Sequence, residues 1–475
     1  MQRTGDVAQN LRWRIGGAGP ARDAAIDPRL RRSYDLRGVV GDSLTDADAQ
    51  GVGRRFAAMA ADEGARRVAV SRDGRTSSPM LEAALVDGLV EAGMHVHRLP
   101  PGPTPLVSFA IHRLGLDAGI MVTGSHNPPN QNGFKFHLGP DPFYGEALKR
   151  LWAVEPSVRE GGSLEEIDLA GPYLDALAAE LDGITVASAV WDSGNGSTGP
   201  MVERLVARVG GQQTLFTIMD GTFPNHHPDP SVPTNLELLR DAVIAGRADL
   251  GIAFDGDGDR IGLVDDAGEI VWADQLMLLL ARDILRERPR SAIVADVKSS
   301  AVLFDGIATA GGRPVMAPSG YVLIRERMLA ERAPLAGEMS GHIFFGDRWH
   351  DADDGLYVAV RTLRALAAFG SLRAFRESLP ATFATPEVRF ACPDHRKAAV
   401  LAAIAARAEA EGRAIDRTDG LRVAEDGGWW LLRASGTEAK LTARCEAQSA
   451  DLLGTIRRRL AEALRCEGLA PAGLD

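Results

Sequence analysis

Cysteine and long apolar runs are both scarce in this sequence. Its three cysteines, Cys392, Cys445 and Cys466, form no Cys-x-x-Cys pair, so neither a disulfide framework nor a zinc site is indicated. No segment approaches the roughly 18 consecutive apolar residues of a transmembrane helix. The start of the chain also lacks the apolar segment of a signal peptide. We therefore expect a cytoplasmic protein that does not enter a membrane.

Positive charge is in deficit as well. With 53 Lys and Arg against 64 Asp and Glu, the net charge is −11, which argues against nucleic acid or an anionic membrane surface as the main partner. The first 32 residues are an exception, with seven Arg against three Asp. We expect this stretch to be mainly a poorly ordered leader, and we place its flexible part at residues 1–25.

The remaining composition is that of a globular protein, and 475 residues are too many for one hydrophobic core. About 150 residues per domain predicts three or four domains. Three segments share one plan, in which a strand ends at an aspartate and an amphipathic helix follows and ends at a glycine. The aspartates are Asp73, Asp192 and Asp296, and the glycines follow 20, 18 and 15 residues later, at Gly93, Gly210 and Gly311.

Strand, helix and strand with short connections form the βαβ unit of a parallel sheet, whose ligands gather at the carboxyl ends of the strands. The repeated aspartate favours internal duplication over chance similarity. After about residue 385 the pattern changes to strands, a hairpin turning at residues 426–428, and two helices. We therefore predict three related α/β domains at residues 26–168, 169–270 and 271–383, plus a C-terminal α+β domain at 384–475.

The strongest chemical signal is FDGDGDR at residues 254–260, where three aspartates alternate with glycines between two apolar strands. Asp255, Asp257 and Asp259 would repel one another without a cation, and oxygen ligands favour Mg²⁺ or Ca²⁺. An EF-hand would need glycine where this chain has Arg260, and an acidic surface turn rarely needs three aspartates at this spacing. We therefore predict a metal site. Arg260 beside it suggests that an anion such as phosphate is also held there.

Two further loops are ambiguous on their own. RASGTEAK follows an apolar strand and could be either an anion cradle or an ordinary polar hairpin end. Its candidate phosphate-binding residues are Arg433, Ser435, Gly436 and Thr437. GEMSGH alternates polar with small residues, so an extended segment would place the polar side chains on one side, either to bind sugar hydroxyls or as an exposed strand face. Those side chains are Glu338, Ser340 and His342.

The segment MVTGSHNPPNQNGFKF, residues 121–136, looks like an exposed, stiff loop. Pro128 and Pro129 exclude a helix there, because proline fixes its own φ and restricts the residue before it. Ser125 is a poor nucleophile unless a base or a metal activates it, and without the aspartate loop it would be interpreted as a turn or capping serine. With that loop, Ser125 can be offered to a metal-stabilised phosphoryl group, with Lys135 as a candidate proton shuttle.

TGSHNPP, FDGDGDR, GEMSGH and RASGTEAK, in this order, resemble the motifs of the α-D-phosphohexomutase family, and within it those of the bacterial phosphomannomutase/phosphoglucomutase group. YDLRG, FPNHHPDPSVPTNLE and DDGLY extend the likeness from about residue 30 to the end. The resemblance implies three mixed α/β domains and a fourth domain around a central cleft. It also implies a phosphosugar partner and a role in carbohydrate metabolism and nucleotide-sugar biosynthesis. We expect a monomer or a weak dimer.

The resemblance assigns roles to individual residues. Ser125 would carry the phosphate as phosphoserine and would hold one Mg²⁺ together with Asp255, Asp257 and Asp259. Phosphate binding and proton transfer beside it would involve Arg37, His126, Lys135 and Arg260. The sugar and its other phosphate would contact Tyr34, Lys298, Gly320, Tyr321, Glu338, Ser340, His342, Arg433, Ser435, Gly436 and Thr437.

The implied reaction has two steps. Phosphoserine gives its phosphoryl group to the free hydroxyl of a hexose monophosphate, which makes a hexose 1,6-bisphosphate, the expected activator. The sugar then turns over and returns its other phosphate to Ser125. Two positions depart from the family pattern: Gly436 replaces a common asparagine, and Tyr321 replaces the histidine of many dual-specificity members, which bears on the preference between mannose and glucose.

Three alternatives remain. A phosphoglucosamine mutase usually has glutamine where this chain has Met339. A metal-dependent sugar phosphatase would use the same serine and metal with water as the acceptor. A non-catalytic phosphosugar sensor would not need Ser125, Lys135 and the three aspartates together.

Overall fold

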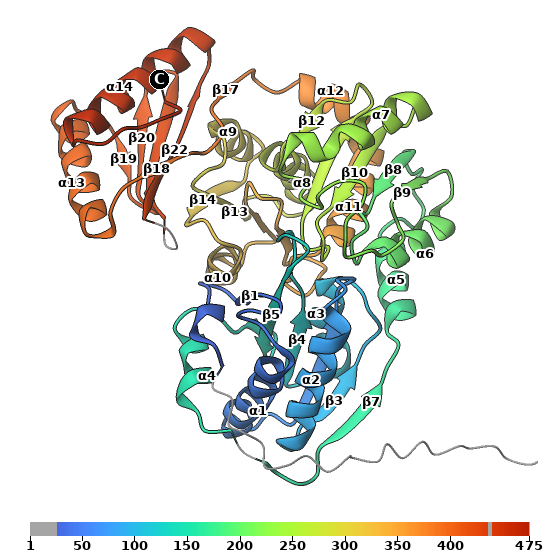
Figure 1. Ribbon diagram of the computed structural model, residues 1–475. Helices are drawn as coiled ribbons and strands as arrows, with labels where there is room; N and C mark the ends of the chain where they lie inside the picture. The colour runs from blue at the N-terminus through green and yellow to red at the C-terminus, as the bar shows by residue number, and fades with distance from the viewer. Residues whose placement is uncertain (1–25, 157, 436–438, 475) are drawn as a thin grey trace, which may run out of the picture.

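The computed structural model describes residues 26–156, 158–435 and 439–474, which form four sheets with their own helices (Figure 1). The predicted flexible leader at residues 1–25 and the predicted phosphate contacts Gly436 and Thr437 lie outside the described residues. Ile26 and Leu30 are 1% and 0% exposed and belong to the core of the first domain. The prediction of a leader extending to residue 32 is therefore wrong from Ile26 onward.

The first sheet is a mixed sheet of seven strands. Its domain contains η1 (Pro28–Leu30), β1 (Leu36–Val39), α1 (Asp46–Asp62), β2 (Arg67–Arg72), α2 (Ser78–Glu91), β3 (His95–Arg98), α3 (Thr104–Leu114), β4 (Ala118–Val122), β5 (Gln131–Leu138), β6 (Asp141–Pro142), η2 (Ala147–Lys149), α4 (Arg150–Ala153) and β7 (Ser163–Glu166). The strand order is β1-β5-β4-β2-β3-β7, with β6 paired to β5. β4, β2, β3 and β7 are parallel, and β5 runs antiparallel to β1 and β4.

The second sheet has the order β12-β11-β10-β8-β9, and the third has the order β14-β13-β15-β16. The second domain contains α5 (Ala170–Ala179), β8 (Ala189–Asp192), α6 (Gly199–Val209), β9 (Gln213–Leu215), η3 (Pro233–Leu236), α7 (Glu237–Gly246), β10 (Leu250–Phe254), β11 (Ile261–Asp265) and β12 (Ile270–Val271). The third contains α8 (Ala273–Glu287), β13 (Ala292–Asp296), α9 (Ala301–Thr309), β14 (Arg313–Ala317), α10 (Tyr321–Glu331), β15 (Leu335–Gly337), β16 (Ile343–Phe345), α11 (Gly355–Phe369) and α12 (Leu372–Glu377).

The fourth sheet is antiparallel, with the order β17-β22-β21-β20-β19 and β18 paired to β22. Its elements are β17 (Phe383–Ala384), β18 (Val388–Ala391), α13 (Asp394–Ala410), β19 (Ile415–Asp416), β20 (Leu421–Glu425), β21 (Gly428–Ala434), β22 (Lys440–Ala447) and α14 (Ala450–Cys466). The chain crosses into this domain once, through residues 378–382, which connect α12 to β17.

One topology occurs three times. The runs β5-β4-β2-β3, β11-β10-β8-β9 and β16-β15-β13-β14 have the same strand order. In each, two parallel strands are joined through a helix, a third strand returns beside the first, and a fourth folds back antiparallel. The loop between the third and fourth strands carries Ser125, then the three aspartates, then Glu338. This repeat confirms the prediction of three related α/β domains.

Glycine ends the repeated helices, as the sequence predicts. Gly93, Gly210 and Gly311 have φ angles of +88°, +72° and +81°, in the left-handed region that glycine adopts without steric cost at the end of a helix. The chain can therefore reverse direction directly after α2, α6 and α9. This reversal returns it to the sheet for the next parallel strand.

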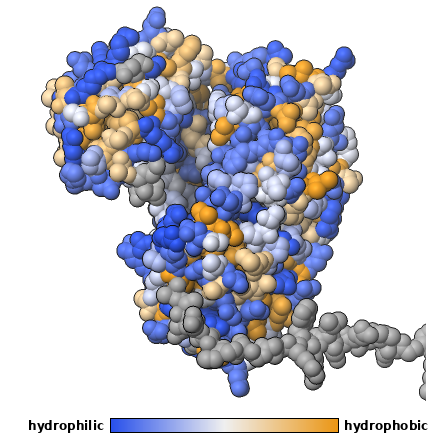
Figure 2. Space-filling view, viewed as in Figure 1, coloured by the Kyte–Doolittle hydropathy of each residue, from blue (hydrophilic) through white to orange (hydrophobic). Residues whose placement is uncertain are grey.

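The hydrophobic cores divide the molecule unequally. One cluster of buried residues runs from α3 of the first domain through the second and third domains, whereas the C-terminal domain has a core of its own. A small cluster of Val297, Trp429 and Leu431 joins the third and C-terminal domains. The surface is hollowed between the C-terminal domain, at the upper left, and the first domain below it (Figure 2). Among the described helices, none is both long and apolar enough to cross a bilayer.

Candidate active site

Ser125 lies in the loop between β4 and β5. It is 4% exposed, so the prediction of an exposed loop is wrong at the serine and holds only at the tip, residues 128–130. Its φ of +48° is in the left-handed region, which residues other than glycine rarely adopt. The N–H of Ser125 donates to Thr123 Oγ1 at 2.8 Å, and Thr123 Oγ1 donates to Asp73 Oδ2 at 2.8 Å. Asp73, at the end of β2, therefore shapes this loop.

The aspartate loop between β10 and β11 faces the serine. Ser125 Oγ donates to Asp255 Oδ2 at 2.8 Å. Asp255, Asp257 and Asp259 are buried, and each offers a carboxylate oxygen within 4.8 Å of those of the other two. Asp257 Oδ1 and Asp259 Oδ1 are buried and have no hydrogen-bond partner among the described residues. Orphaned carboxylate oxygens are the ligands that hard divalent cations prefer, so this cluster could hold a metal ion.

Two buried cations oppose these carboxylates. Lys135 on β5 donates from Nζ to Asp257 Oδ2 at 2.8 Å and also to Asp259. Burial lowers the pKa of Lys135, but Asp257 and Asp259 outweigh burial and raise it well above its usual value. Arg37 on β1 donates from Nε to Asp35 Oδ2 at 2.8 Å and from Nη1 to the carbonyl of Thr123. Both cations therefore lie at the junction of the serine and aspartate loops.

The positive charge does not reach all three carboxylates equally. Burial, together with Asp259 and Asp257, raises the pKa of Asp255 well above its usual value. Burial also acts to raise the pKa of Asp257, but Lys135 and Arg37 outweigh it and hold that pKa well below its usual value. Among the described residues Asp255 has no direct ion pair, and the nearby Arg260 and Lys135 do not outweigh its burial, so a metal ion would add the missing positive charge.

Thr104 is a site residue that the sequence did not reveal. At the first turn of α3, its N–H donates to Asp257 O at 2.8 Å and its Oγ1 donates to Asp257 Oδ2 at 2.6 Å. The partially positive N-terminus of α3 therefore meets the aspartate loop. No sequence signal links Thr104 to a residue 153 positions away.

The GEMSGH segment is a turn and not the extended segment predicted from its alternation. β15 and β16 form an antiparallel pair, and Gly341 turns the chain between them with a φ of +96°. Glu338 and His342 close the turn, because the N–H of Glu338 donates to His342 O at 3.0 Å. Period-two alternation is shared by strands and by tight hairpin ends, so it does not distinguish them.

His342 joins the third loop to the aspartate loop. Arg260 Nε donates to His342 Nε2 at 2.9 Å, and His342 Nδ1 lies 2.7 Å from Asp353 Oδ2. These partners assign the tautomer with hydrogen on Nδ1. Burial lowers the pKa of Arg260, but Asp255 and Asp259 outweigh it and raise the pKa. Asp353 belongs to DDGLY, a motif that the sequence shows without revealing this contact.

Glu338 faces the other predicted sugar contacts. Its Oε2 accepts from Gly320 N at 2.9 Å, and its Oε1 accepts from Ser340 Oγ. Burial acts to raise the pKa of Glu338, but Lys298, together with the hydrogen bonds from Ser340 and Gly320, outweighs burial and lowers the pKa. Lys298 Nζ itself lies 3.8 Å from Asp296 Oδ2, at the end of β13. The third domain thus gathers a carboxylate, a hydroxyl and an ammonium group within one loop cluster.

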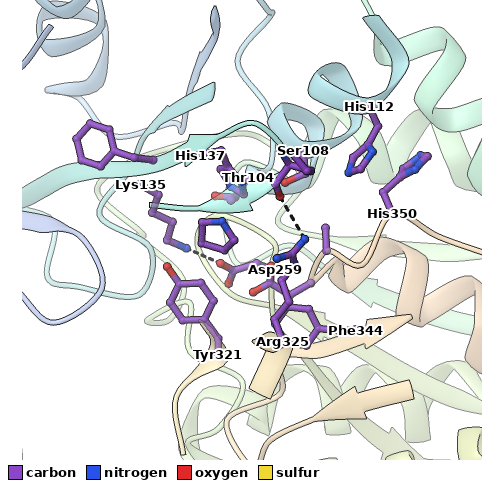
Figure 3. A pocket seen from close by; sticks show the side chains of 15 residues that line it. Thr104, Ser108, His112, Lys135, His137, Asp259, Tyr321, Arg325, Phe344 and His350 are labelled. Carbon is purple, nitrogen blue, oxygen red and sulfur yellow. Dashed lines mark hydrogen bonds and ion pairs between the residues drawn. The ribbon is translucent and has the colours of Figure 1, made fainter. Parts of the chain in front are cut away.

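Tyr321 and Tyr34 form an aromatic contact between the first and third domains. Their ring centroids are 5.6 Å apart, edge to face, and Tyr321 also stacks on His342 at 5.2 Å. Tyr321 lines a small cavity with Lys135 and Asp259 at one end and His112 and His350 at the other (Figure 3). The cavity volume of about 20 Å³ suits a single water molecule and not a hexose phosphate.

His126 contacts the second domain. Its Nδ1 lies 3.2 Å from Asp229 Oδ2, in the FPNHHPDP segment. Burial and the nearby Arg260 lower the pKa of His126. His126 is thus a partly buried imidazole next to Ser125, with its orientation set by a residue of another domain.

The predicted phosphate contacts lie in the C-terminal domain. Arg433 is the sixth residue of β21 and not a loop residue, and its Nη2 pairs with Asp419 Oδ2 at 2.6 Å. The same Asp419 oxygen accepts from Ser319 N of the third domain at 3.0 Å. Ser435 follows the strand, and its carbonyl accepts from Lys397 Nζ at 2.7 Å. Arg433 therefore lies at the boundary between the third and C-terminal domains.

The geometry agrees with comparisons to known proteins. The chain matches models described as phosphoglucomutase/phosphomannomutase alpha/beta/alpha domains I, II and III, at residues 28–147, 172–268 and 272–383, and the C-terminal domain at residues 387–463. It is 39% identical over 444 residues to the phosphoglucomutase of Neisseria gonorrhoeae, which covers 92% of this chain and 96% of that protein.

Two further relatives extend this agreement. The phosphomannomutase/phosphoglucomutase of Pseudomonas aeruginosa is 39% identical over 443 residues, covering 92% of this chain and 96% of its own. The crystal structure of a phosphoglucomutase/phosphomannomutase family protein from Burkholderia thailandensis has a TM-score of 0.85 and 37% identity, covering 92% of this chain and 97% of that one. The chain therefore belongs to the phosphoglucomutase/phosphomannomutase family, the α-D-phosphohexomutases that its motifs resemble.

Proposed function

We propose that this hexose phosphate mutase interconverts the 1-phosphates and 6-phosphates of mannose or glucose through a phosphoserine at Ser125 and a hexose 1,6-bisphosphate. The observation that carries the proposal is the contact of Ser125 Oγ with Asp255, within a buried carboxylate cluster that Lys135 opposes. A serine in this setting can carry a phosphoryl group whose charge is neutralised on several sides.

We assign the role of each residue from its position in the site. In the first step the Oγ–P bond of phosphoserine breaks, a P–O bond to the free sugar hydroxyl forms, the hydroxyl proton passes to a base, and Ser125 Oγ takes up a proton. In the second step the P–O bond at the other end of the sugar breaks and that sugar oxygen takes up a proton, while Ser125 receives the phosphoryl group and gives up its own proton. We assign these proton transfers to Lys135 on β5 and to His126, which follows Ser125 in the loop, and phosphate binding to Arg37 and Arg260.

One Mg²⁺ would be held by Ser125 with Asp255, Asp257 and Asp259. When bound, it supplies charge neutralisation at the phosphoryl oxygens. Lys135 shares two of these carboxylates, so its raised pKa would fall in the loaded enzyme and it could then accept a proton.

Sugar and phosphate recognition belong to the third and C-terminal domains in this proposal. Glu338 and Ser340 would accept the sugar hydroxyls, with the rest of the sugar pocket formed by Tyr34, Lys298, Gly320, Tyr321 and His342. The phosphate that is not reacting would bind Arg433 and Ser435, with Gly436 and Thr437 completing the predicted loop.

The test combines the intact mass of the protein with an assay primed by glucose 1,6-bisphosphate. We expect the wild type to gain the mass of one phosphoryl group at Ser125 and to convert mannose 1-phosphate or glucose 1-phosphate to the 6-phosphate. Ser125→Ala should lose both properties and still bind phosphosugar. Unchanged turnover in Ser125→Ala would refute the phosphoserine.

The same assay separates the alternatives. Turnover restricted to glucosamine phosphate would identify a phosphoglucosamine mutase, and stoichiometric release of inorganic phosphate would identify a phosphatase. Binding without turnover would identify a sensor. The oligomeric state, a monomer or weak dimer, and the cytoplasmic location stay predictions, and sedimentation velocity at micromolar concentration tests the first.

A further inference from the structure

Arg75, which the proposed mechanism does not use, lies directly under the Ser125 loop. It is 1% exposed, and its terminal nitrogens donate to four backbone carbonyls of that loop. The acceptors are Ser125 O and Asn127 O, at 2.7 and 2.6 Å from Nη2, and Pro128 O and Gln131 O, at 2.6 and 2.9 Å from Nη1.

The guanidinium is fixed on its other sides as well. Its Nε lies 3.3 Å from Asp73 Oδ2, the carboxylate that also accepts from Thr123 and from the N–H of Gly124. The ring of Phe223, from the second domain, lies 5.2 Å from its Cζ. A Cβ at Gly124 would overlap that Cζ atom. Arg75 therefore fills a closed space between two domains.

Four carbonyl oxygens converge on one point only if a donor with several N–H groups lies there. Guanidinium offers five N–H donors in a planar fork, whereas ammonium offers three around a single atom. Without Arg75, the buried carbonyl of Ser125 and the partly buried ones of Asn127 and Gln131 would lose this donor, and each unsatisfied group would favour rearrangement of the loop. The left-handed φ of Ser125 would also favour rearrangement of the loop, because a strained conformation persists only where its surroundings determine it.

We propose that Arg75 is a positioning residue for phosphoryl transfer, which holds Ser125 in the left-handed conformation that directs Oγ to Asp255. The inference rests on the proposed role of Ser125 as phosphoryl carrier. Arg75 does not touch the sugar or its phosphates in this arrangement. Its loss should therefore affect the chemical step and not substrate binding.

The test compares Arg75→Lys and Arg75→Met with Arg55→Lys as the matched control. Arg55 also donates to backbone carbonyls in the first domain, those of Leu151 and Val154, but it is remote from the serine. For Arg75→Met we expect kcat to fall about 100-fold, the effect of a misplacement near 1 Å, with KM changed less than about twofold. Arg75→Lys should recover part of this loss, and Arg55→Lys should keep wild-type kcat.

Two further readouts separate positioning from folding. The rate of Ser125 phosphorylation by glucose 1,6-bisphosphate should fall in parallel with kcat, and hydrogen exchange should rise in residues 123–131 and not elsewhere. Rates are expressed per molecule competent to bind phosphosugar, so that unfolded protein does not count. Phe223→Leu leaves Arg75 in place and removes only the aromatic ring that covers it. This variant should show a smaller fall in the phosphorylation rate and a smaller rise in hydrogen exchange than Arg75→Met.

The proposal is overturned if kcat per competent molecule is unchanged, or if KM rises as much as kcat falls. A wild type without phosphoserine and without turnover would instead overturn the proposed function. In that case the hydrogen-exchange comparison alone still decides whether Arg75 holds the loop, so the two failures are distinguishable.

Discussion

At the scale of single residues, Arg433, which we propose binds the substrate's phosphate, already forms an ion pair with a carboxylate of the protein. Asp419 pairs with Arg433 at 2.6 Å and also accepts from Ser319 N. Both ion-pair side chains are partly exposed, at 18% and 21%, so water and an incoming phosphate can reach them. The phosphate must therefore displace Asp419 from Arg433 before it gains the full interaction.

Asp419→Asn should tighten phosphosugar binding. Asparagine keeps an oxygen for Ser319 N but removes the competing charge, and a partly exposed ion pair contributes about 0.2–1 kcal/mol. We expect the dissociation constant for hexose 6-phosphate to fall by a factor of about 1.4 to 5 in calorimetry. Asp416→Asn, three residues earlier and without contact to Arg433, is the control. Weaker binding in Asp419→Asn would show that Asp419 orients Arg433 rather than competing for it.

His226 should make stability depend on pH. Its Nε2 lies 2.9 Å from Asp192 Oδ2 and its Nδ1 lies 3.0 Å from His227 O. Burial lowers the pKa of His226, but Asp192 outweighs burial and raises it. A raised pKa stabilises the fold fully below the unfolded value of about 6.5, and this contribution is lost as pH rises through the folded value.

The measurement is the urea midpoint at about pH 6 and about pH 9, on either side of that transition. The wild type should lose more stability over this interval than His226→Gln, which cannot be protonated. Equal losses in the two proteins would contradict the assignment to His226.

The metal site was the strongest signal in the sequence because its three aspartates are close along the chain. Asp255, Asp257 and Asp259 lie within five consecutive positions, so their spacing can be seen in the sequence itself. Arg75 lies 50 positions from Ser125 and Thr104 lies 153 from Asp257, so only the folded chain brings them together. The sequence shows the repeat of Asp73, Asp192 and Asp296, but it does not show that Asp73 accepts hydrogen bonds from Thr123 and Gly124 of the Ser125 loop.

At the scale of elements, helices α1 and α2 lie in close contact because glycine occurs on both. A Cβ at Gly53 would overlap Leu85 O, and a Cβ at Gly88 would overlap Gln50 O. The pattern of strand, aspartate, helix and glycine was readable from the sequence because it is local. The order of the strands and this helix contact were not, because both depend on pairing between distant segments.

Gly88→Ala should destabilise the protein by about 1–3 kcal/mol, the usual cost of overpacking. Gly454→Ala in α14 is the control, since its nearest neighbour would be Arg458 Nη1 at 3.5 Å. That change should be neutral or stabilise by up to about 1 kcal/mol, because alanine is the better helix former. Thermal unfolding followed by circular dichroism measures both. A Gly88→Ala protein as stable as the wild type would mean that the helices can separate without cost.

At the scale of the whole molecule, one hydrophobic cluster links the first three domains, and a separate small cluster attaches the fourth domain to the third. The first three share the cluster that runs through α3, whereas Val297, Trp429 and Leu431 are the apolar link to the fourth. Polar contacts add to this link, because Arg422 Nη1 donates to Val297 O and Ser299 O at 2.6 and 2.8 Å. Domains joined by a small interface move relative to one another.

Glucose 1,6-bisphosphate should therefore reduce the radius of gyration in solution scattering. Ser125→Ala is the suitable protein, because it should bind the bisphosphate without turnover. Arg433→Met should bind the bisphosphate more weakly and show no reduction of the radius of gyration at the same ligand concentration. In this variant the C-terminal domain lacks the guanidinium that would contact the ligand. A profile that the ligand leaves unchanged would contradict domain closure.

The single crossing at residues 378–382 has a consequence for the second half of the reaction. A linker this short keeps the C-terminal domain at a high effective concentration beside the other three, even when every contact between them is broken. In the proposed reaction, the C-terminal domain can thus release the bisphosphate while the sugar reverses. The domain then binds the bisphosphate again in a first-order step that does not depend on protein concentration. Lengthening the linker would lower that local concentration and favour escape of the intermediate over its return to Ser125.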